Sequence, residues 1–527
     1  MKPEHRELGW SKPEQVRGMS STWACVLSRV YPRTRAVSGL PVLLGILASI
    51  TVVRLIGLKT SAVDLFSDEA QYWDWSRQPA WGYFSKPPLL AWIIAAARQV
   101  CGDGEECIRA PAPILYLGTS LLVYALGRQL YDARVAFFAG LAVALSTGVA
   151  FSARIISTDV PLLFCWALAL LAFCKLLTGN RAWAIVLGVS LGLGLLAKYA
   201  MIYFLLGVAH AAWLDAEARR LARTPAFWFA LGIAALMITP NVGWNFGHGF
   251  PSITHIEETI QERGIELNPL NALEFIAAQF AVFGPVIFAV LLIAVIQMRS
   301  AEMSRTDRVM LAFAVPPLAL VTAMGLFTRL NGNWAAPAFI SAIVVVTAVL
   351  IRRQALTWLV LSVAIGIVAQ AALLVADTRA YTLHLPWLAN GDIYHRTLGW
   401  HALGEEAGRI ARSVGARTIV AERRHEIAAL TYYGRDHPEG IAAWPRGPLP
   451  VDQFDIDRPL TETTPQPLLL VSDCPLSHRL MADFASVEPL GSLVTPTGPK
   501  TARIYFAFKL DGRKGPIRPP RPCLDKE

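Results

Sequence analysis

The feature that most constrains this chain is a series of apolar stretches, each about long enough to cross a bilayer, that recur as far as residue 376. A membrane-spanning helix needs about 20 residues that are mostly apolar. The composition agrees, because 54% of the residues are hydrophobic, only 17% are charged, and the mean hydropathy is +0.43. Since soluble domains carry about 25% charged residues, the sequence predicts an α-helical polytopic membrane protein.

Eleven membrane spans are predicted from these stretches. They cover residues 41–58, 110–128, 135–154, 160–177, 182–197, 200–214, 226–243, 273–297, 309–327, 335–351 and 355–376. Threaded from a cytoplasmic N-terminus, they place the basic clusters of the connecting loops on one side, as the positive-inside rule requires. These clusters are Arg128 and Arg134; Lys175 and Arg181; Arg219, Arg220 and Arg223; Arg299, Arg305 and Arg308; and Arg352 and Arg353.

The spans divide the chain into three predicted parts. Residues 1–40 form a cytoplasmic tail, 41–376 the membrane domain, and 377–527 a soluble domain on the outer face. The tail is long for a signal peptide and shows no clear cleavage site, so the first span is interpreted as a retained signal anchor. The net charge of +9 collects in the tail and in the short loops of one side, which argues against nucleic-acid binding.

The outer domain has the pattern of a small α/β fold. We expect helices over 400–414 and 424–434, and strands over 417–422, 467–473 and 502–509. Its sequence suggests no catalytic site.

Two long loops are predicted on the outer face, at 59–109 and 245–271. The first contains an apolar segment after Pro87 and Pro88 that predicts an interfacial helix, since proline is favoured where a helix begins. The second carries charged and imidazole side chains, which are His248, His255, Glu257, Glu258 and Arg263. The seven-residue spacing of its two histidines supports no particular metal site.

Four of the seven cysteines are predicted to face the oxidising side: Cys101, Cys107, Cys474 and Cys523. They permit three pairings, of which 101–107 and 474–523 are the most local. Free thiols are the alternative.

Charged residues beside the first span are the strongest functional signal. Asp68 and Glu69 follow the span within the run Phe66-Ser-Asp-Glu-Ala-Gln-Tyr-Trp-Asp-Trp-Ser. Lys86 precedes two prolines, which fix the backbone and remove two amide donors. A lysine held in this way at the membrane surface suits a phosphate that enters from the bilayer. The alternative is that all three are ordinary interfacial charges.

Further polar residues occur at the outer ends of other spans, and they favour a shared outward cavity. They are Asp159, Lys198, Tyr199, Asn241, Trp244, Asn245, His248, Arg329, Asn333 and Trp334. Ionisable groups at membrane depth are costly and tend to mark functional cavities. Alternatively, Lys198 snorkels to the interface, and the two tryptophans are plain interfacial anchors.

Six short strings together resemble glycosyltransferase family 39. They are Asp68-Glu-Ala-Gln-Tyr, Lys86-Pro-Pro-Leu, Asp159-Val-Pro, Ala197-Lys-Tyr, Pro240-Asn-Val-Gly-Trp-Asn and Asn333-Trp-Ala-Ala-Pro-Ala. They look most like the bacterial aminoarabinose and galacturonic-acid transferases that modify lipopolysaccharide. The resemblance, which covers roughly residues 40–350, implies the GT-C fold, a polyprenyl-phosphate sugar donor and work at the periplasmic face of the inner membrane.

Two positions depart from the patterns of related branches. Gln71 and Tyr72 stand where protein O-mannosyltransferases usually carry His and Phe, and Ser85 stands where the aminoarabinose branch tends to have Glu. The runs around them look closer to the galacturonic-acid transferases.

A mechanism follows from the chemistry of such a donor. Its phosphate is a good leaving group, so the reaction needs a base for the acceptor hydroxyl and positive charge for the departing phosphate. Asp68 is the expected base, with Glu69 orienting the acceptor or assisting. Lys86, Tyr83, Lys198 and Arg329 are the expected donor-binding residues, and Asp159, Tyr72, Tyr199, Trp244 and Asn333 the acceptor or cavity residues. A single displacement inverts the anomeric configuration.

The leading prediction is therefore an inverting transferase that moves one sugar from a polyprenyl phosphate to a lipopolysaccharide, lipid A or related envelope glycan. The resemblance implies a reaction that does not depend on a metal ion, and the alternative is that the same carboxylates bind a divalent cation. The alternatives are a membrane transporter, a protein O-mannosyltransferase and a non-catalytic envelope scaffold. A transporter would place charge near the bilayer midplane, often within repeated halves, and this sequence shows neither.

Overall fold

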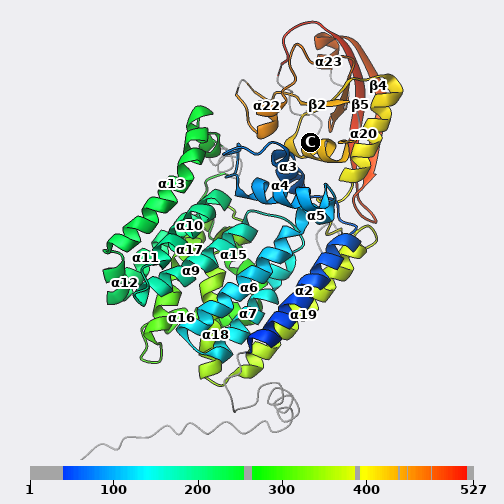
Figure 1. Cartoon of the computed structure of the whole chain (residues 1–527). Helices are drawn as coiled ribbons and strands as arrows, with labels where there is room; N and C mark the ends of the chain where they lie inside the picture. The colour runs from blue at the N-terminus through cyan, green and yellow to red at the C-terminus, as the bar shows by residue number, and fades with distance from the viewer. Residues whose placement is uncertain are drawn as a thin grey trace, which may run out of the picture.

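A computed structural model of the chain describes residues 39–254, 264–385, 392–436, 439–447, 449–475 and 478–518. Figure 1 shows a bundle of long helices with a smaller domain of helices and strands at one end. The predicted tail before residue 39 lies outside the described residues, as do His255, Glu257, Glu258 and Arg263 of the second predicted loop.

The bundle and its connecting segments are almost entirely helical. The elements are α2 (Leu40–Thr60), α3 (Ser67–Arg77), α4 (Leu89–Cys101), α5 (Glu105–Arg109), α6 (Pro111–Leu130), α7 (Ala133–Ala144), α8 (Thr147–Ser152), α9 (Asp159–Leu177), α10 (Trp183–Ala197), η1 (Tyr199–Ile202), α11 (Tyr203–Leu214), α12 (Ala216–Leu221), α13 (Pro225–Gly247), α15 (Pro269–Val282), α16 (Pro285–Ile296), α17 (Arg305–Gly325), η2 (Gly332–Ala335), α18 (Ala338–Arg352) and α19 (Leu356–Thr378).

Six helical stretches among the described residues are long and apolar enough to cross a membrane. They are α2, α9, α13, α17, α19 and the stretch Glu105–Leu130 that contains α5 and α6. The shorter apolar helices α7, α10 and α18, and the stretch Tyr199–Leu214, coincide with four further predicted spans. Each predicted span thus corresponds to a helix or a helix pair, while the total of eleven crossings stays a prediction.

Two of the predicted spans are interrupted. Span 273–297 is divided between α15 and α16, which meet at 120°. Gly284 adopts φ +89° there, a conformation that favours glycine, and Pro285 begins the next helix. Span 135–154 is divided where Ser146 accepts a hydrogen bond from the Val149 amide, which caps a new helix.

The apolar segment after the two prolines forms the predicted helix, α4. It lies with α3 at the end of the bundle, beneath the smaller domain (Figure 1). Its interfacial position stays a prediction.

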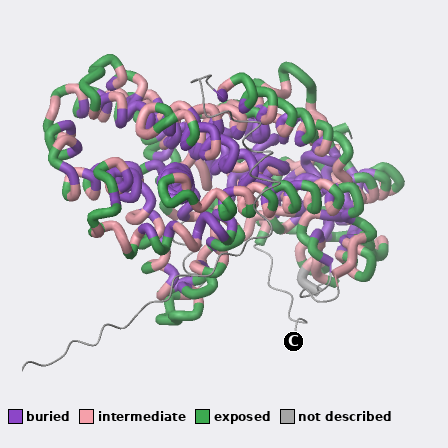
Figure 2. The backbone as a smooth tube through the Cα atoms, turned by 90° about the horizontal axis from the view of Figure 1, so that it is seen from below, coloured by how far each residue is buried: buried purple, intermediate pink, exposed green. Residues whose placement is uncertain are grey.

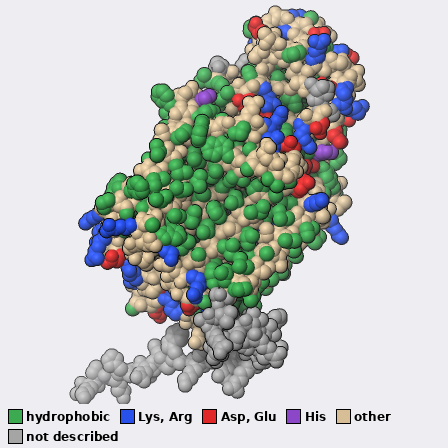
Figure 3. All heavy atoms as spheres, viewed as in Figure 1, with side chains coloured by type: hydrophobic (Ala, Val, Ile, Leu, Met, Phe, Trp, Pro, Cys, Tyr) green, Lys and Arg blue, Asp and Glu red, His purple; other side chains and the backbone are tan. Residues whose placement is uncertain are grey.

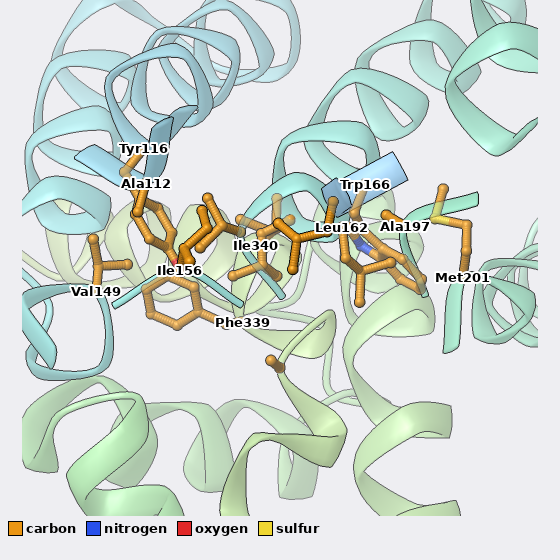
Figure 4. Close-up of a cluster of buried hydrophobic side chains, with 14 of the residues drawn as sticks. Ala112, Tyr116, Val149, Ile156, Leu162, Trp166, Ala197, Met201, Phe339 and Ile340 are labelled. Atoms are coloured by element: carbon orange, nitrogen blue, oxygen red, sulfur yellow. The ribbon is translucent and has the colours of Figure 1, made fainter. Parts of the chain in front are cut away.

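The interior of the bundle is apolar and closely packed. Figure 4 shows part of it, where Tyr116 of α6, Trp166 of α9, and Phe339 and Ile340 of α18 lie in one cluster with Ile156 of the segment before α9. Viewed along the molecule in Figure 2, the buried segments gather inside and the exposed segments line the periphery.

One buried charge lies within a span. The Arg54 side chain of α2, which is 3% exposed, donates to Gln370 Oε1 at 2.9 Å and to the Ala144 carbonyl at 2.6 Å. Because a guanidinium inside a span must find partners in the protein, Arg54 ties α2 to α19 and to the end of α7.

The C-terminal domain is a five-stranded sheet with helices. Its elements are α20 (Trp400–Val414), β1 (Thr418–Ala421), α21 (Arg424–Tyr433), β2 (Gly440–Ala443), α22 (Gln453–Asp457), β3 (Leu468–Ser472), α23 (His478–Asp483), β4 (Phe484–Pro496) and β5 (Ala502–Arg513). The strand order is β2-β1-β3-β5-β4, in which β1 pairs in parallel with β2 and β3, while β5 is antiparallel to β3 and β4.

The predicted helices and strands of this domain are present, and two strands were not predicted. β2 is only four residues long. β4 contains Pro489 and Gly491, at an irregularity in its pairing with β5, and both residue types argue against a strand when the sequence is considered alone.

The C-terminal domain is fastened to the segments that follow the first span. The Tyr433 hydroxyl accepts from the Leu65 amide at 2.7 Å, and Asp64 accepts from the Trp400 amide at 2.8 Å. The Tyr432 hydroxyl donates to the Asp103 carbonyl at 2.7 Å. These contacts hold α20 and α21 over α3 and α5, so the domain forms one wall of the region that contains Asp68.

Cys101 and Cys107 form the first of the two expected disulfides, with Cα atoms 5.8 Å apart. The bond closes the short loop between α4 and α5. The second expected pair cannot be followed, because Cys523 lies outside the described residues. Cys165 and Cys174 are buried free thiols within α9.

The surface carries a broad hydrophobic face. Figure 3 shows this face bordered at the lower edge by Lys and Arg side chains, and at the upper edge by a mixture of basic and acidic residues. This distribution is typical of a membrane-embedded bundle.

Candidate active site

Glu69 is held rigidly at the start of α3. Its carboxylate accepts from Arg109 Nε at 3.0 Å and Nη2 at 2.7 Å, and from the Ile156 amide at 2.8 Å. It also accepts from the Phe66 amide at 3.0 Å, completing a capping contact. The residue is 2% exposed. These partners occupy both carboxylate oxygens and fix the loop at this position.

Asp68, its neighbour, lies in a different environment. Its side chain is 38% exposed, and Oδ1 lies 2.6 Å from Nη1 of Arg424. The same guanidinium nitrogen donates to Gln71 Oε1 at 2.6 Å. Asp68 therefore keeps an accessible carboxylate beside a single cation, which comes from the C-terminal domain.

Asp159 joins three separate parts of the bundle. It is the first residue of α9, and its Oδ1 accepts from Lys198 Nζ at 2.7 Å. Its Oδ2 accepts from Asn333 Nδ2 at 2.6 Å. Asp159, Lys198 and Asn333, all predicted site residues, thus form one group. Through these contacts the Asp159 carboxylate holds the Lys198 ammonium in place.

Lys86 lies in the turn between α3 and α4. Its backbone exchanges hydrogen bonds with Tyr83, at 3.2 and 3.4 Å, and Pro87 and Pro88 follow. Burial lowers the pKa of the Lys86 ammonium, and the nearby Lys198 and Arg424 lower it further, while Asp68 and Asp159 oppose them. Within the described part of the chain no side chain pairs with this ammonium, so it is available to an anionic ligand.

Tyr72 lies close to the charged groups Asp68, Asp159 and Arg424. It is buried, and its pKa is raised by that burial and by Asp68. The phenol therefore stays protonated at neutral pH and can donate a hydrogen bond to a ligand.

Two further predicted site residues, Tyr83 and Tyr199, make hydrogen bonds that stabilise the loop between α3 and α4 or its contact with α13. The Tyr83 hydroxyl donates to the Trp75 carbonyl at 2.9 Å and accepts from the Ala80 amide at 3.0 Å. The Tyr199 hydroxyl donates to Asn241 Oδ1 at 2.9 Å, and Asn241 Nδ2 donates to the Trp81 carbonyl at 2.8 Å. Tyr83 and Tyr199 thus hold the first loop in shape and against α13.

Arg329 has an exposed partner. Its Nε lies 3.0 Å from Glu274, and the two side chains are 76% and 57% exposed. The pair thus joins Arg329 to an exposed residue of α15, whereas Lys198 and Asn333 contact Asp159.

Arg424 is the candidate site residue that the sequence did not predict. It is the first residue of α21, and two residues separate it from the carboxyl end of the parallel strand β1. Functional residues often occur at such positions, and the run Glu422-Arg-Arg-His-Glu could have drawn attention to it. Sequence alone could not place it beside Asp68.

The carboxylates of the cluster are engaged by cations of the chain itself. Asp68 is paired with Arg424, and Asp159 with Lys198. Among the described residues, a group of three side chains spaced for a metal ion occurs at Glu422, Asp473 and Cys474, and none of these is a predicted site residue.

Comparisons with known proteins show which proteins this chain is similar to. The family model described as dolichyl-phosphate-mannose-protein mannosyltransferase matches residues 85–244. The lipid A galacturonosyltransferase RgtD of Rhizobium johnstonii is 32% identical over 443 residues, which are 83% of this chain and 91% of that protein. The lipopolysaccharide core galacturonosyltransferase RgtA of the same organism is 30% identical over 34% of this chain and 37% of its own length.

Solved structures show the same fold. ArnT from Cupriavidus metallidurans in the apo state superimposes with a TM-score of 0.59 at 16% identity, covering 91% of this chain and 100% of that chain. The same protein bound to undecaprenyl phosphate gives a TM-score of 0.60 at 17% identity, covering 90% and 98%.

Proposed function

This chain belongs to the family of GT-C membrane glycosyltransferases that includes the lipid A galacturonosyltransferase RgtD, and we propose that it transfers galacturonic acid from a polyprenyl phosphate to lipid A. The single observation that carries the proposal is the 32% identity to RgtD over 83% of the chain. The likeness to ArnT, whose structure contains undecaprenyl phosphate, supports the lipid carrier.

The charges of the site favour an acidic sugar. Three cations, Lys86, Lys198 and Arg424, lie in one electrostatic cluster with two carboxylates, Asp68 and Asp159. A polyprenyl-phosphate galacturonate has one negative charge on its phosphodiester and one on its sugar, and both are stabilised by a net positive site. The amine of aminoarabinose would instead meet like charges.

The proposed reaction is a single displacement. The acceptor hydroxyl oxygen forms a bond to the anomeric carbon while the bond from that carbon to the phosphate oxygen breaks. Asp68 takes the hydroxyl proton, and Lys86 stabilises the negative charge on the departing polyprenyl phosphate. Attack from the face opposite the leaving group inverts the anomeric configuration. Asp159 fixes Lys198 beside the donor.

We place the site and the C-terminal domain together at the periplasmic face of the inner membrane. The contact between Arg424 and Asp68 requires the C-terminal domain and the first loop to share one side. With a cytoplasmic N-terminus, the first loop follows one crossing and the C-terminal domain follows eleven. Both numbers are odd, so both parts lie on the periplasmic side. The Lys and Arg border opposite the domain in Figure 3 supports the same orientation.

The family model's description leaves protein O-mannosylation as the second candidate. The match to that model ends at residue 244, whereas the similarity to RgtD extends over most of the chain. We therefore favour a glycolipid acceptor over a protein acceptor.

Mass spectrometry of envelope lipids tests the proposal in cells. Deleting the gene should remove one hexuronic acid from lipid A, and wild-type protein should restore it, whereas Asp68→Asn protein at equal abundance should not. An unchanged lipid A in the deletion strain, with altered glycosylation of envelope proteins instead, would favour the second candidate.

A further inference from the structure

A cavity lies at the opposite end of α3 from Asp68. It has a volume of about 360 Å³ and is bounded by the end of α3, the following loop, the end of α13 and the C-terminal domain. The residues that matter for its chemistry are Asp74, Arg77, Gln78, Trp244, His248 and Asp457. Asp68, Lys86, Asp159 and Lys198 are not among the residues that line it. Its size is within the usual range for small-molecule sites, about 300–1,000 Å³.

One wall of the cavity is aromatic. Trp244 and His248 stack with ring centroids 4.1 Å apart and an angle of 17° between the rings. The loop fits closely around this pair, because a Cβ added to Gly82 would lie 2.5 Å from the Trp244 ring. His248 is exposed and Trp244 half-buried, so the pair offers apolar ring surface to a ligand.

His248 also offers a polar atom. Its Nδ1 lies 2.8 Å from the Trp244 carbonyl oxygen, which can only accept a hydrogen bond. Nδ1 is therefore the donor, and in the neutral ring Nε2 is left as an acceptor.

The charged groups of the cavity balance one another. Asp74 accepts from Arg458 Nη2 at 2.8 Å, and Arg77 lies 3.8 Å from the same carboxylate. Asp457 accepts from Gln453 Nε2 at 3.0 Å. Two acids and two bases give no net charge, so the cavity provides donors and acceptors without favouring an anion.

We propose that this cavity binds a neutral sugar ring of the acceptor glycolipid. An apolar ring face with surrounding hydroxyl groups matches the aromatic wall and the mixed donors and acceptors, whereas a phosphate would gain nothing from a lining of zero net charge. An acyl chain would displace water from the charged groups and offer them no hydrogen bonds in exchange. The role as an acceptor subsite rests on the proposed function.

The position of the cavity suits this role. Tyr83 lines the cavity, and its backbone is hydrogen-bonded to that of Lys86. The turn that carries the donor-binding residue Lys86 therefore also contributes Tyr83 to the wall of the cavity. A ring held in the cavity would bring a neighbouring ring of the same glycan toward Asp68.

Direct binding tests the cavity without any chemistry. The probe is the dephosphorylated disaccharide backbone of lipid A with N-acetyl groups in place of its fatty acyl chains, which carries no charge. It is added to the full-length protein in detergent, and binding is followed by saturation-transfer-difference NMR. Wild-type protein should bind it, and Trp244→Ala and Asp457→Asn should each weaken binding roughly tenfold, as the loss of one good contact implies. Trp228→Ala and Asp511→Asn, which remove exposed side chains that do not line the cavity, should bind as wild type.

Steady-state kinetics then separate the subsite from the donor site. With lipid A as the varied substrate, the two cavity variants should raise KM roughly tenfold and leave the Kd for the polyprenyl-phosphate donor unchanged. An unchanged donor Kd also shows that each variant is folded.

The failures of the two proposals can be told apart. Wild-type protein that transfers the sugar but does not bind the probe, or cavity variants with an unchanged acceptor KM, would overturn the subsite. Binding of the probe that is lost in Trp244→Ala, without any transfer by wild-type protein, would uphold the sugar-binding cavity and reject the proposed function.

Discussion

Arg424 of the C-terminal domain and Asp68 of the first loop form an ion pair, Nη1 to Oδ1 at 2.6 Å, between residues 356 positions apart. Both side chains are about one-third exposed, so a substrate can reach the pair. Through this contact the C-terminal domain supplies part of the site, and α21 must be docked for the site to be complete.

Replacing Arg424 should therefore impair transfer. Arg424→Ala should lower kcat about 100-fold, because a fixed cation is lost from the cluster, and Arg424→Lys should recover part of the rate. The adjacent Arg423, which pairs with Asp473 instead, provides the matched control, and Arg423→Ala should transfer normally. Equal rates for the two alanine variants, measured with purified protein in liposomes, would remove Arg424 from the site.

Asp68→Asn should abolish the chemical step but not donor binding. An amide cannot take the proton of the acceptor hydroxyl, so kcat should fall by about 100-fold to 10,000-fold, the range expected for a general base. The donor Kd, measured by calorimetry, should stay near the wild-type value. A variant that keeps wild-type kcat would exclude Asp68 as the base.

Lys86 should control donor affinity and its dependence on pH. Because its pKa is lowered, mainly by burial, the ammonium loses its proton at a lower pH than a free lysine, whose pKa is about 10.4. Donor affinity should thus weaken as pH rises toward 10.4, and Lys86→Ala should be weak throughout. Lys86→Arg, which stays charged, should lose less affinity over the same range. A wild-type affinity that does not change with pH would contradict this role.

Glu69 should matter for stability more than for catalysis. Glu69 and Arg109 form a buried ion pair. Removing one partner leaves the other charge buried and unpaired, which lowers the free energy of unfolding by about 3–5 kcal/mol. Arg109→Met should consequently lower the midpoint of thermal unfolding strongly. Glu274→Gln, which breaks an exposed pair with Arg329, is the control and should cost at most about 1 kcal/mol. If Arg109→Met and Glu274→Gln lost similar amounts of stability, burial of the ion pair would not determine its contribution to stability.

The helices were largely predictable, because hydrophobic length is a strong signal. The breaks within the helices were harder to predict. Gly284 and Pro285 lie between the end of α15 and the body of α16, but glycine and proline also occur inside continuous membrane helices. Pro240 lies within the continuous helix α13 and illustrates the ambiguity.

The site was predictable only in part. Asp68, Lys86, Asp159, Lys198 and Asn333 could be assigned to one face because each ends a span or follows one. Glu69 could not be distinguished from Asp68, since neighbouring helical residues differ in direction by about 100°, and only the fold shows which carboxylate meets Arg109. Arg424 required the docking of the C-terminal domain, which no local pattern encodes.

The most direct test of the account is sugar transfer by purified protein in liposomes that contain lipid A. Separate reactions contain either polyprenyl-phosphate galacturonate or polyprenyl-phosphate aminoarabinose. The masses of the lipid A products are measured by mass spectrometry. The account predicts the mass of one hexuronic acid added from the first donor, with inverted anomeric configuration, and little product from the second. Equal or faster transfer of aminoarabinose, or no product from the galacturonate donor, would contradict it.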